Sequence, residues 1–413
     1  MRVNQPQKLG LTPTFGYGDR LGNATPGHIY SHRAHGNGIA PIFAQQSIRE
    51  LERTGRTAND VIRTAREAVI NCDFSDPWGA DADHLKTIDD VALMVRQGYT
   101  FYTIDPSDHV NDEADLLSES ELETKFDEMD TPVPWVDTYS GKSVTIDSTV
   151  ILEFDHRVLM RAAVKYAAAI DHTLDIAREI ESRCNAAQIQ YEIEVSIDES
   201  EHPTTLPEHF IIADQCIRAG VSLISMAPRY PGQFEKGIDF KGDLTVFSDT
   251  LAKHAAIARY LGPYKLSLHS GSDKLSIYPI FSRITKGLYH VKTAGTSYLE
   301  ALRVVARVDA SLFRQIVNYS CGKFQDDRRS YHISGQLDKL PVLAGVADDV
   351  LEEAYLVSDD SRQVLHVTFG SVLNNPDIGP AMQTLVEDRV DVYHEVLEEH
   401  FNQHLIALQG DNE

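Results

Sequence analysis

Short segments with strand character recur along the chain, and most of them precede a stretch with helical periodicity. Apolar and polar residues alternate within several of these segments, which is typical of β-strands; helical patterns follow at 47–70, 87–97, 206–219, 249–261, 297–323 and 378–408. Strand–helix alternation favours a parallel sheet, and eight such units favour a closed α/β barrel of the (β/α)8 TIM type. The predicted strands cover residues 41–46, 78–84, 100–105, 190–198, 221–227, 265–269, 287–293 and 363–369.

The connection after the third predicted strand is too long for an ordinary loop. It contains an acidic helical pattern at 108–130 and a strongly periodic one at 157–184. We therefore predict one barrel domain over residues 1–413, with residues 106–187 forming a helical insertion that could act as a lid. The first 40 residues are rich in turn-forming residues, and we expect them to cap one end of the barrel.

The polar residues of the predicted strands should face the barrel axis. Helices cover the outside of a closed α/β barrel, so the apolar set must face outward. An open antiparallel sheet with its polar face in water is the alternative, but the interleaved helices disfavour it. The inward set would include Glu192, Glu194, Ser196, Asp198, Thr103, Asp105, Ser267, His269, His290, Lys292, His366 and Thr368. Because buried charges are costly unless they are paired or bind a metal, these residues predict a polar pocket at the carboxyl end of the barrel.

The overall charge excludes some classes of partner. The chain has 38 Lys and Arg against 62 Asp and Glu, a net charge of −24. Such an excess argues against nucleic acid and against an anionic membrane surface as partners. There is no apolar run long enough to span a membrane and no apolar N-terminal signal region, and the four cysteines show no paired spacing. We expect a cytoplasmic protein that takes a small molecule, and a homo-oligomer is compatible with these features.

The inward set offers ligands for a transition metal. Glu194 and Asp198 lie on one predicted strand, and His269, His290 and His366 lie on three others. Oxygen and imidazole donors of this kind suit Zn, Mn, Ni, Co or Fe better than Ca or Mg. Three protein ligands and a vacant position would form a Lewis-acid site.

Residues beyond the sixth predicted strand could hold an anion. The stretch HSGSDK supplies backbone donors together with Ser270, Ser272 and Lys274. Lys86 and Arg229 could add positive charge to the same pocket, although a surface position is equally consistent with their sequence context.

Seven stretches together resemble the tagaturonate epimerase family. They are GDRLGNATPGH, GADADHLK, FYTIDPSD, VSIDESEHPTTLPEHF, HSGSDKLSIYP, LYHVKTAGTSYLEALR and VLHVTFGSVL, and they span nearly the whole chain. The resemblance implies a metal-dependent enzyme that interconverts D-tagaturonate and D-fructuronate. Some members of the family act on the neutral sugars fructose and tagatose.

The implied reaction inverts a carbon that lies two bonds from the ketone carbon, so simple enolisation cannot reach its hydrogen. A retro-aldol route can: a base deprotonates the hydroxyl on that carbon, the adjacent carbon–carbon bond breaks, and it re-forms on the other face of the aldehyde. From the inward set we predict Glu194, His269 and His290 as metal ligands. Asp198 would be a further ligand or the base, and Asp105 is the rival base. Lys292 and His366 would polarise or orient the keto-diol end.

Two other readings remain open at this point. A metal-dependent class II-type aldolase or ketose isomerase would need nearly the same pocket. A non-catalytic sugar-acid-binding protein would bind the same ligand without converting it.

Overall fold

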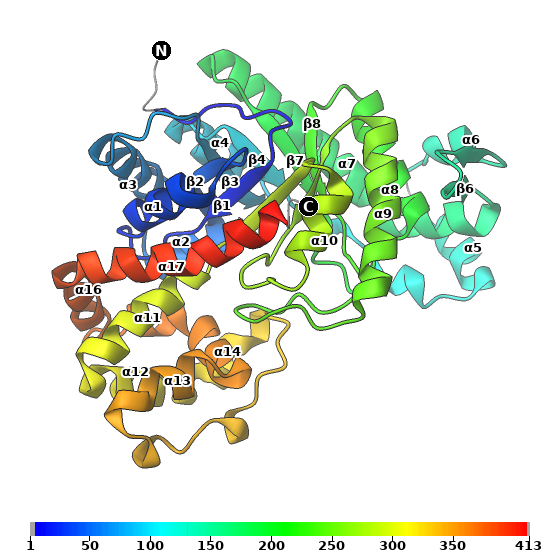
Figure 1. The fold of residues 1–413 in the computed structure, drawn as a ribbon. Coiled ribbons are helices and arrows are strands. Elements are labelled where there is room, and N and C mark those ends of the chain that lie inside the picture. The colour runs from blue at the N-terminus through cyan, green and yellow to red at the C-terminus, as the bar shows by residue number, and fades with distance from the viewer. Residues whose placement is uncertain (1–4, 130, 411–413) are drawn as a thin grey trace.

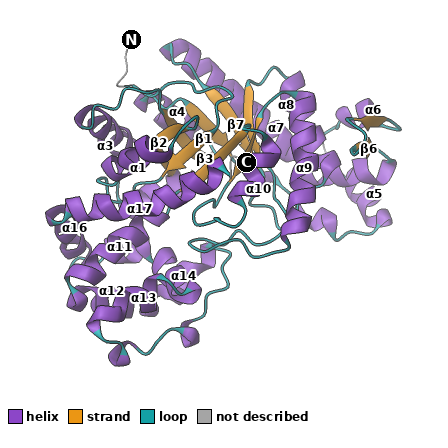
Figure 2. Ribbon diagram, viewed as in Figure 1, coloured by secondary structure: helices purple, strands orange, loops and turns teal. Residues whose placement is uncertain are grey.

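Eight parallel strands close into a barrel at the centre of the molecule, and helices surround it (Figures 1 and 2). The hydrogen-bonded order around the barrel is β1-β10-β9-β8-β7-β4-β3-β2, and β5 pairs antiparallel with β6 in a separate two-stranded sheet. This confirms the predicted α/β barrel. The strands are β1 Thr14–Tyr17, β2 Ala40–Ser47, β3 Gly79–Leu85, β4 Phe101–Ile104, β5 Ser143–Thr145, β6 Ile151–Glu153, β7 Glu192–Ser196, β8 Leu223–Ala227, β9 Lys265–Leu268 and β10 Tyr289–Thr293.

The computed structural model describes residues 5–129 and 131–410, so residues 1–4, 130 and 411–413 of the predicted domain lie outside the described residues. The α-helices are α1 Thr25–His35, α2 Ile48–Thr54, α3 Ala58–Asn71, α4 Ile88–Gln97, α5 Glu119–Asp127, α6 Trp135–Tyr139, α7 His156–Ala187, α8 Leu206–Arg218, α9 Leu244–Leu261, α10 Tyr278–Thr285, α11 Thr296–Val308, α12 Ala310–Asp327, α13 Leu351–Leu356, α14 Asp359–Val367, α15 Phe369–Leu373, α16 Ile378–Asp388 and α17 Val390–Gln409. Short 3-10 turns occur at Ser107–His109, Asp112–Asp115, Arg328–Ser330, Leu337–Lys339, Leu343–Gly345 and Asp348–Val350. None of the described helices is both long and apolar enough to cross a membrane.

Several barrel helices begin at a threonine followed three residues later by an acid. In α3, α4 and α8 the threonine hydroxyl accepts the backbone N–H of the third helical residue, whose carboxylate accepts the N–H of the threonine. This reciprocal arrangement satisfies backbone donors that have no partner within the helix. The first turns of α4 and α8, the helices that follow β3 and the β7 loop, are thereby stabilised.

The alternation on β7 and β10 has the predicted orientation. Ile193, Val195 and Val291 join the hydrophobic core between the strands and the helices. Glu194 and Lys292 instead meet across the barrel interior, where the Glu194 carboxylate lies 3.0 Å from the Lys292 ammonium. The polar residues of these strands therefore occupy the barrel interior.

The prediction of a strand at 363–369 is wrong. Residues 359–367 form α14, where Val364 and Leu365 pack inward and the Thr368 hydroxyl donates to their carbonyls, one helical turn back. The short apolar–polar pattern in this stretch is compatible with a helix as well as with a strand. A pattern of so few residues does not distinguish the two kinds of element.

The remaining barrel strand is β1, within the N-terminal segment that we expected to consist of turns. It has only four residues, TFGY, and a single polar side chain among them, so its alternation is too short to be noticed. The part that covers the barrel is shorter than expected: the backbone N–H groups of Leu9 and Gly10 donate to the Glu192 carboxylate at the start of β7.

Residues 106–187 contain α5, α6, the β5–β6 pair and the long helix α7. Helix α7 packs against α4 and α8 beside the barrel. Helices α5 and α6 and strand β6 lie at the edge of the molecule, away from the barrel (Figure 1). The treatment of this whole segment as an insertion with a lid function stays a prediction.

Candidate active site

A cavity of about 630 Å³ lies at the carboxyl ends of the barrel strands. This size is within the range of small-molecule sites, roughly 300–1,000 Å³. Residues from β3, from β10 and from the loops after β7, β8 and β9 contribute to its walls. Those that carry the chemistry are Asp83, His84, Asp198, Arg229, His269 and Lys292.

The Lys292 ammonium lies among three carboxylates at the floor of the cavity. Its Nζ is 2.8 Å from Asp81, 2.7 Å from Asp83 and 3.0 Å from Glu194, and it donates to the Thr103 hydroxyl. Burial disfavours the charged form, but the three carboxylates outweigh burial and raise the pKa of Lys292 well above its ordinary value. Lys292 is therefore a fixed positive charge and not a base.

His269 has a carboxylate on each side of its ring. Its Nε2 is 2.7 Å from Glu194 Oε1, and its Nδ1 is 3.0 Å from Asp198 Oδ1. Burial alone would lower the pKa of His269, but Asp198 and Glu194 outweigh it and raise that pKa. Asp198 faces the cavity, whereas Glu194 is fully buried beneath it.

His84 completes this part of the site from the end of β3. Its ring meets that of His269 edge-on, with 5.1 Å between centroids, and its Nδ1 is 3.1 Å from Asp105 Oδ2. Burial opposes protonation, yet Asp83 and Asp105 raise the pKa of His84 to about 10. His84 has a φ of +54°, in the left-handed region that non-glycine residues rarely adopt. Such backbone strain is common at functional sites.

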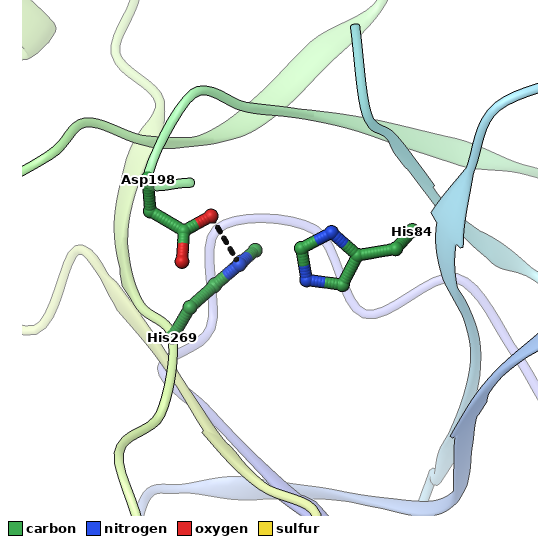
Figure 3. A group of neighbouring side chains, drawn as sticks. All are labelled: His84, Asp198 and His269. Atoms are coloured by element: carbon green, nitrogen blue, oxygen red, sulfur yellow. Dashed lines mark ion pairs between the residues drawn. The ribbon is translucent and has the colours of Figure 1, made fainter. Parts of the chain in front are cut away.

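His84, Asp198 and His269 point toward one another (Figure 3). Their potential ligand atoms all lie within 4.8 Å of each other. In their neutral form two imidazoles with one carboxylate suit a transition metal such as zinc, which would displace the protons that the neighbouring carboxylates favour on the rings. Three ligands would leave further coordination positions on the cavity side. The chemistry of the donors therefore fits the metal that the sequence predicts.

The predicted ligands His290 and Glu194 lie deeper than this group. The Nδ1 of His290 is 2.9 Å from the Thr14 hydroxyl, and its Nε2 is 3.8 Å from Asp81. Burial lowers the pKa of His290. Within residues 5–129 and 131–410, no group of three such donors close enough to share an ion includes either residue. Of the three predicted ligands, only His269 lines the cavity.

The other predicted residues divide between the cavity and its surroundings. Ser270, Ser272 and Arg229 line the cavity, and so does His366, which reaches it from α14 instead of from a strand. Lys274 points away: its ammonium donates to backbone carbonyls, including those of Glu235 and Ser272.

Two further predicted residues, Asp105 and Lys86, lie behind His84. Asp105 accepts the backbone N–H of Ser107 and bonds His84. The Lys86 ammonium is 2.7 Å from Asp108 and 3.7 Å from Asp105. Neither residue lines the cavity.

Sequence reasoning missed His84, Asp81 and Asp83. The two aspartates alternate with Ala80 and Ala82, which is the same signal that revealed the polar faces of the other strands. His84 could not be found in this way, because strict alternation places it opposite Asp83. The pairing of β3 with β4 shifts register between Ala82 and Leu85, and this irregularity lets both neighbours reach the cavity.

The chain matches the family model described as tagaturonate epimerase over residues 1–408. It is 42% identical over 406 residues to the tagaturonate/fructuronate epimerase of Thermotoga maritima, covering 98% of this chain and 82% of that protein. A crystal structure of the fructuronate-tagaturonate epimerase of Cohnella laeviribosi superposes with a TM-score of 0.93 at 38% identity, covering 98% of this chain and 83% of that one. A glycerol complex of the same protein gives the same TM-score at 37% identity, with the same coverage of both chains.

Proposed function

Because the chain belongs to the tagaturonate epimerase family and is therefore a carbohydrate epimerase, we propose that it interconverts D-tagaturonate and D-fructuronate in this cavity. The observation that carries the proposal is the group formed by His84, Asp198 and His269, which faces the cavity beside the Lys292 ammonium. We further propose that these three residues hold a divalent metal, with His84 taking the place predicted for His290.

A divalent ion held there would act as a Lewis acid toward the ketone and hydroxyl oxygens of the substrate. Neighbouring residues of the chain set the orientation of the two proposed histidine ligands. Asp105 orients the His84 ring through its Nδ1, and Glu194 orients the His269 ring through its Nε2. Partners of this kind fix the direction in which an imidazole presents its other nitrogen. The contacts of Asp105 thus support a role in positioning His84 better than the predicted alternative role as the catalytic base.

We propose Asp198 as the base in addition to its role as a ligand, with one carboxylate oxygen for each role. It is the carboxylate of the group that lines the cavity. Burial favours its neutral form, but His269 outweighs burial and keeps the pKa of Asp198 far below its usual range. The carboxylate is therefore ionised at neutral pH but is a weak base, so the substrate hydroxyl whose proton Asp198 accepts would have to be acidified by the bound ion.

The proposed reaction is retro-aldol cleavage followed by re-addition. Loss of the hydroxyl proton turns the inverted carbon into an aldehyde carbon as its bond to the ketone-bearing fragment breaks. The electron pair of that bond stays with the ketone-bearing fragment, which becomes an enediolate. The Lys292 ammonium would stabilise the negative charge of this enediolate from the cavity floor. After the aldehyde rotates, the same pair re-forms the bond on the opposite face, and Asp198 returns the proton.

The direct test is product analysis by NMR after incubation with tagaturonate, fructuronate or fructose, each with a panel of divalent metals. We expect the epimeric keto-uronate as the product. Net cleavage products would instead identify an aldolase, and binding without turnover would identify a sugar-acid-binding protein.

The retro-aldol route has its own test in deuterated water. The hydrogen on the inverted carbon stays bonded to that carbon throughout, so the product should carry no deuterium there. Deuterium at this position would overturn the route in favour of direct proton abstraction.

A further inference from the structure

Most of the cations at the cavity are paired with carboxylates. Arg20 lies 2.7 Å from Glu50, and Arg49 lies 3.2 Å from Glu199. Lys292 is surrounded by the three carboxylates of the cavity floor. Such pairing is expected in a chain with 62 acidic and 38 basic residues.

Arg229 and Lys236 are different. Both lie in the loop between β8 and α9, both line the cavity, and both are half-buried. Within the part of the chain that the structure describes, neither side chain forms an ion pair or a hydrogen bond, and carboxylates such as Asp198 favour their charges only from farther away. Burial lowers the pKa of each residue, which reflects the cost of holding a charge there without a partner. Two unpaired cations facing one cavity point to an anionic ligand.

The surrounding contacts hold the segment around Lys236 in place. The Lys274 ammonium donates to the carbonyl oxygens of Glu235, at 2.8 Å, and of Ile238. Arg362 donates through its Nε to the Gly237 carbonyl at 2.7 Å. The carbonyls on both sides of Lys236 are therefore bonded, while its own ammonium is left for the cavity.

The backbone of Arg229 is held in a similar way. Its N–H donates to the Thr204 hydroxyl, and its carbonyl accepts the Thr204 N–H, both at 2.9 Å. A loop fixed in this manner loses little further freedom when a ligand binds, so its cations are preorganised for an anion.

We infer that Arg229 and Lys236 bind the carboxylate of the substrate and thereby select a sugar acid over a neutral ketose. This inference rests on the proposed function, because it assigns the acid group of the same substrate to one wall of the same cavity. It also replaces the predicted role of Lys274, whose ammonium holds the loop instead of the ligand. A charge-assisted contact to a guanidinium also offers two parallel hydrogen bonds to a carboxylate.

Binding of non-reacting analogues tests the inference without turnover. Gluconate and sorbitol differ by a carboxylate in place of a hydroxymethyl group, and calorimetric titration should show tighter binding of gluconate to the wild-type enzyme. Lys236→Met and Arg229→Met should each weaken gluconate binding by about 10-fold or more, since a hydrogen bond to a charged group is lost. Sorbitol binding should change by less than about 3-fold.

Matched variants guard against trivial causes. Lys253→Met removes a lysine from the exposed side of α9 and should leave both affinities unchanged. Lys236→Arg keeps the charge and should retain most of the preference for gluconate, while circular dichroism verifies folding. Equal losses for gluconate and sorbitol in Lys236→Met and Arg229→Met would overturn the inference. Tighter binding of sorbitol 6-phosphate than of gluconate would also overturn it, because the site would then be built for a phosphate ester.

Kinetics separate this inference from the proposed function. If the wild-type enzyme converts tagaturonate, the two methionine variants should lower kcat/KM for tagaturonate by about 10-fold or more and leave that for tagatose nearly unchanged. Parallel losses on both substrates would reject the carboxylate contacts while the epimerase function stands. If the wild-type enzyme converts no keto-uronate but the variants lose gluconate binding, the proposed function fails and the carboxylate contacts stand.

Discussion

Two clusters in this molecule have nearly the same composition and opposite character. The first is His84, Asp198 and His269 at the cavity, and the second is Asp273, His400 and His404, where the loop after β9 meets α17. Each combines two imidazoles with a carboxylate, and each is compact enough to hold an ion. The donors of the first cluster are paired as well, because His269 contacts Asp198 and His84 contacts Asp105. What separates the two clusters is whether a ligand can reach them and whether a cation lies against their carboxylate.

In the second cluster the partners are already in place. His404 Nε2 accepts the Asp273 backbone N–H at 3.0 Å, and its Nδ1 donates to the His400 carbonyl. The Asp273 carboxylate is 3.1 Å from Arg362, a cation that would repel a metal. None of the three residues lines the cavity. Residue composition alone therefore does not separate these clusters as candidates for a metal site, whereas access from the cavity does.

The largest expected difference between the clusters is in metal content and turnover. His269→Ala should abolish stable binding of the divalent metal and lower kcat/KM by more than about 100-fold, the upper effect of removing only a supporting partner. His400→Ala should retain both, and should instead lower the free energy of unfolding by about 1–3 kcal/mol because Glu300 and Asp273 lose a partner.

Elemental analysis of the purified variants, beside product assays and urea denaturation, checks this contrast. Chelation of the metal should abolish wild-type activity, and added metal should restore it. Metal retained by His269→Ala but lost by His400→Ala would reverse the assignment of the two clusters.

The second cluster should make the fold sensitive to acid. Burial lowers the pKa of His404 from its usual 6.5 to about 4. Between these values the unfolded chain binds a proton that the folded protein does not, so stability falls as the pH drops from 6.5 toward 4. At pH 5 this one residue contributes a loss of about 2 kcal/mol.

His404→Gln keeps an acceptor for the Asp273 N–H but removes the titration. Its unfolding free energy should therefore depend less steeply on pH between 6.5 and 5 than that of the wild-type protein, as measured by urea denaturation. An unchanged slope would show that His404 does not carry this dependence.

The smallest expected effect on stability and substrate binding is that of replacing Gln45, which lines the same cavity as the first cluster. Gln45 lines the cavity and is only 1% exposed, yet neither polar atom of its amide has a hydrogen-bonding partner. Gln45→Leu should leave stability unchanged or raise it by about 1 kcal/mol, because a buried unpaired amide is removed. The same change should raise KM for the keto-uronate severalfold if the amide binds a substrate hydroxyl. A destabilised variant with unaltered KM would assign Gln45 a structural role instead.

Much of the fold could be predicted because alternation and helical periodicity are local properties. Seven of the predicted strands correspond to barrel strands. On β3, β7 and β10 the polar residues Asp81, Glu194 and Lys292 meet in the interior, as helical cover on the outside requires. The failures have local causes too. The β1 segment has four residues with one polar side chain, too short a pattern to recognise. His366 lies in a stretch whose pattern fits a strand and a helix equally.

The site was less accessible to sequence reasoning. His84 reaches the cavity through a register shift that no pattern in GADADHLK reveals. Lys274 follows the predicted anion-binding turn in sequence, but its long side chain turns back to the backbone of another loop. Lys236 shows no signal at all in sequence, because the lack of an ion-pair partner is a property of its neighbours in space.

The sequence by itself determined the barrel and the inward direction of its polar residues, since both follow from periodicity and from the need to bury apolar side chains. Only the tertiary structure decided which of those residues share the cavity and which already have partners. That distinction depends on distances between atoms far apart in the chain, and these depend on register shifts, loop paths and packing that local patterns do not encode.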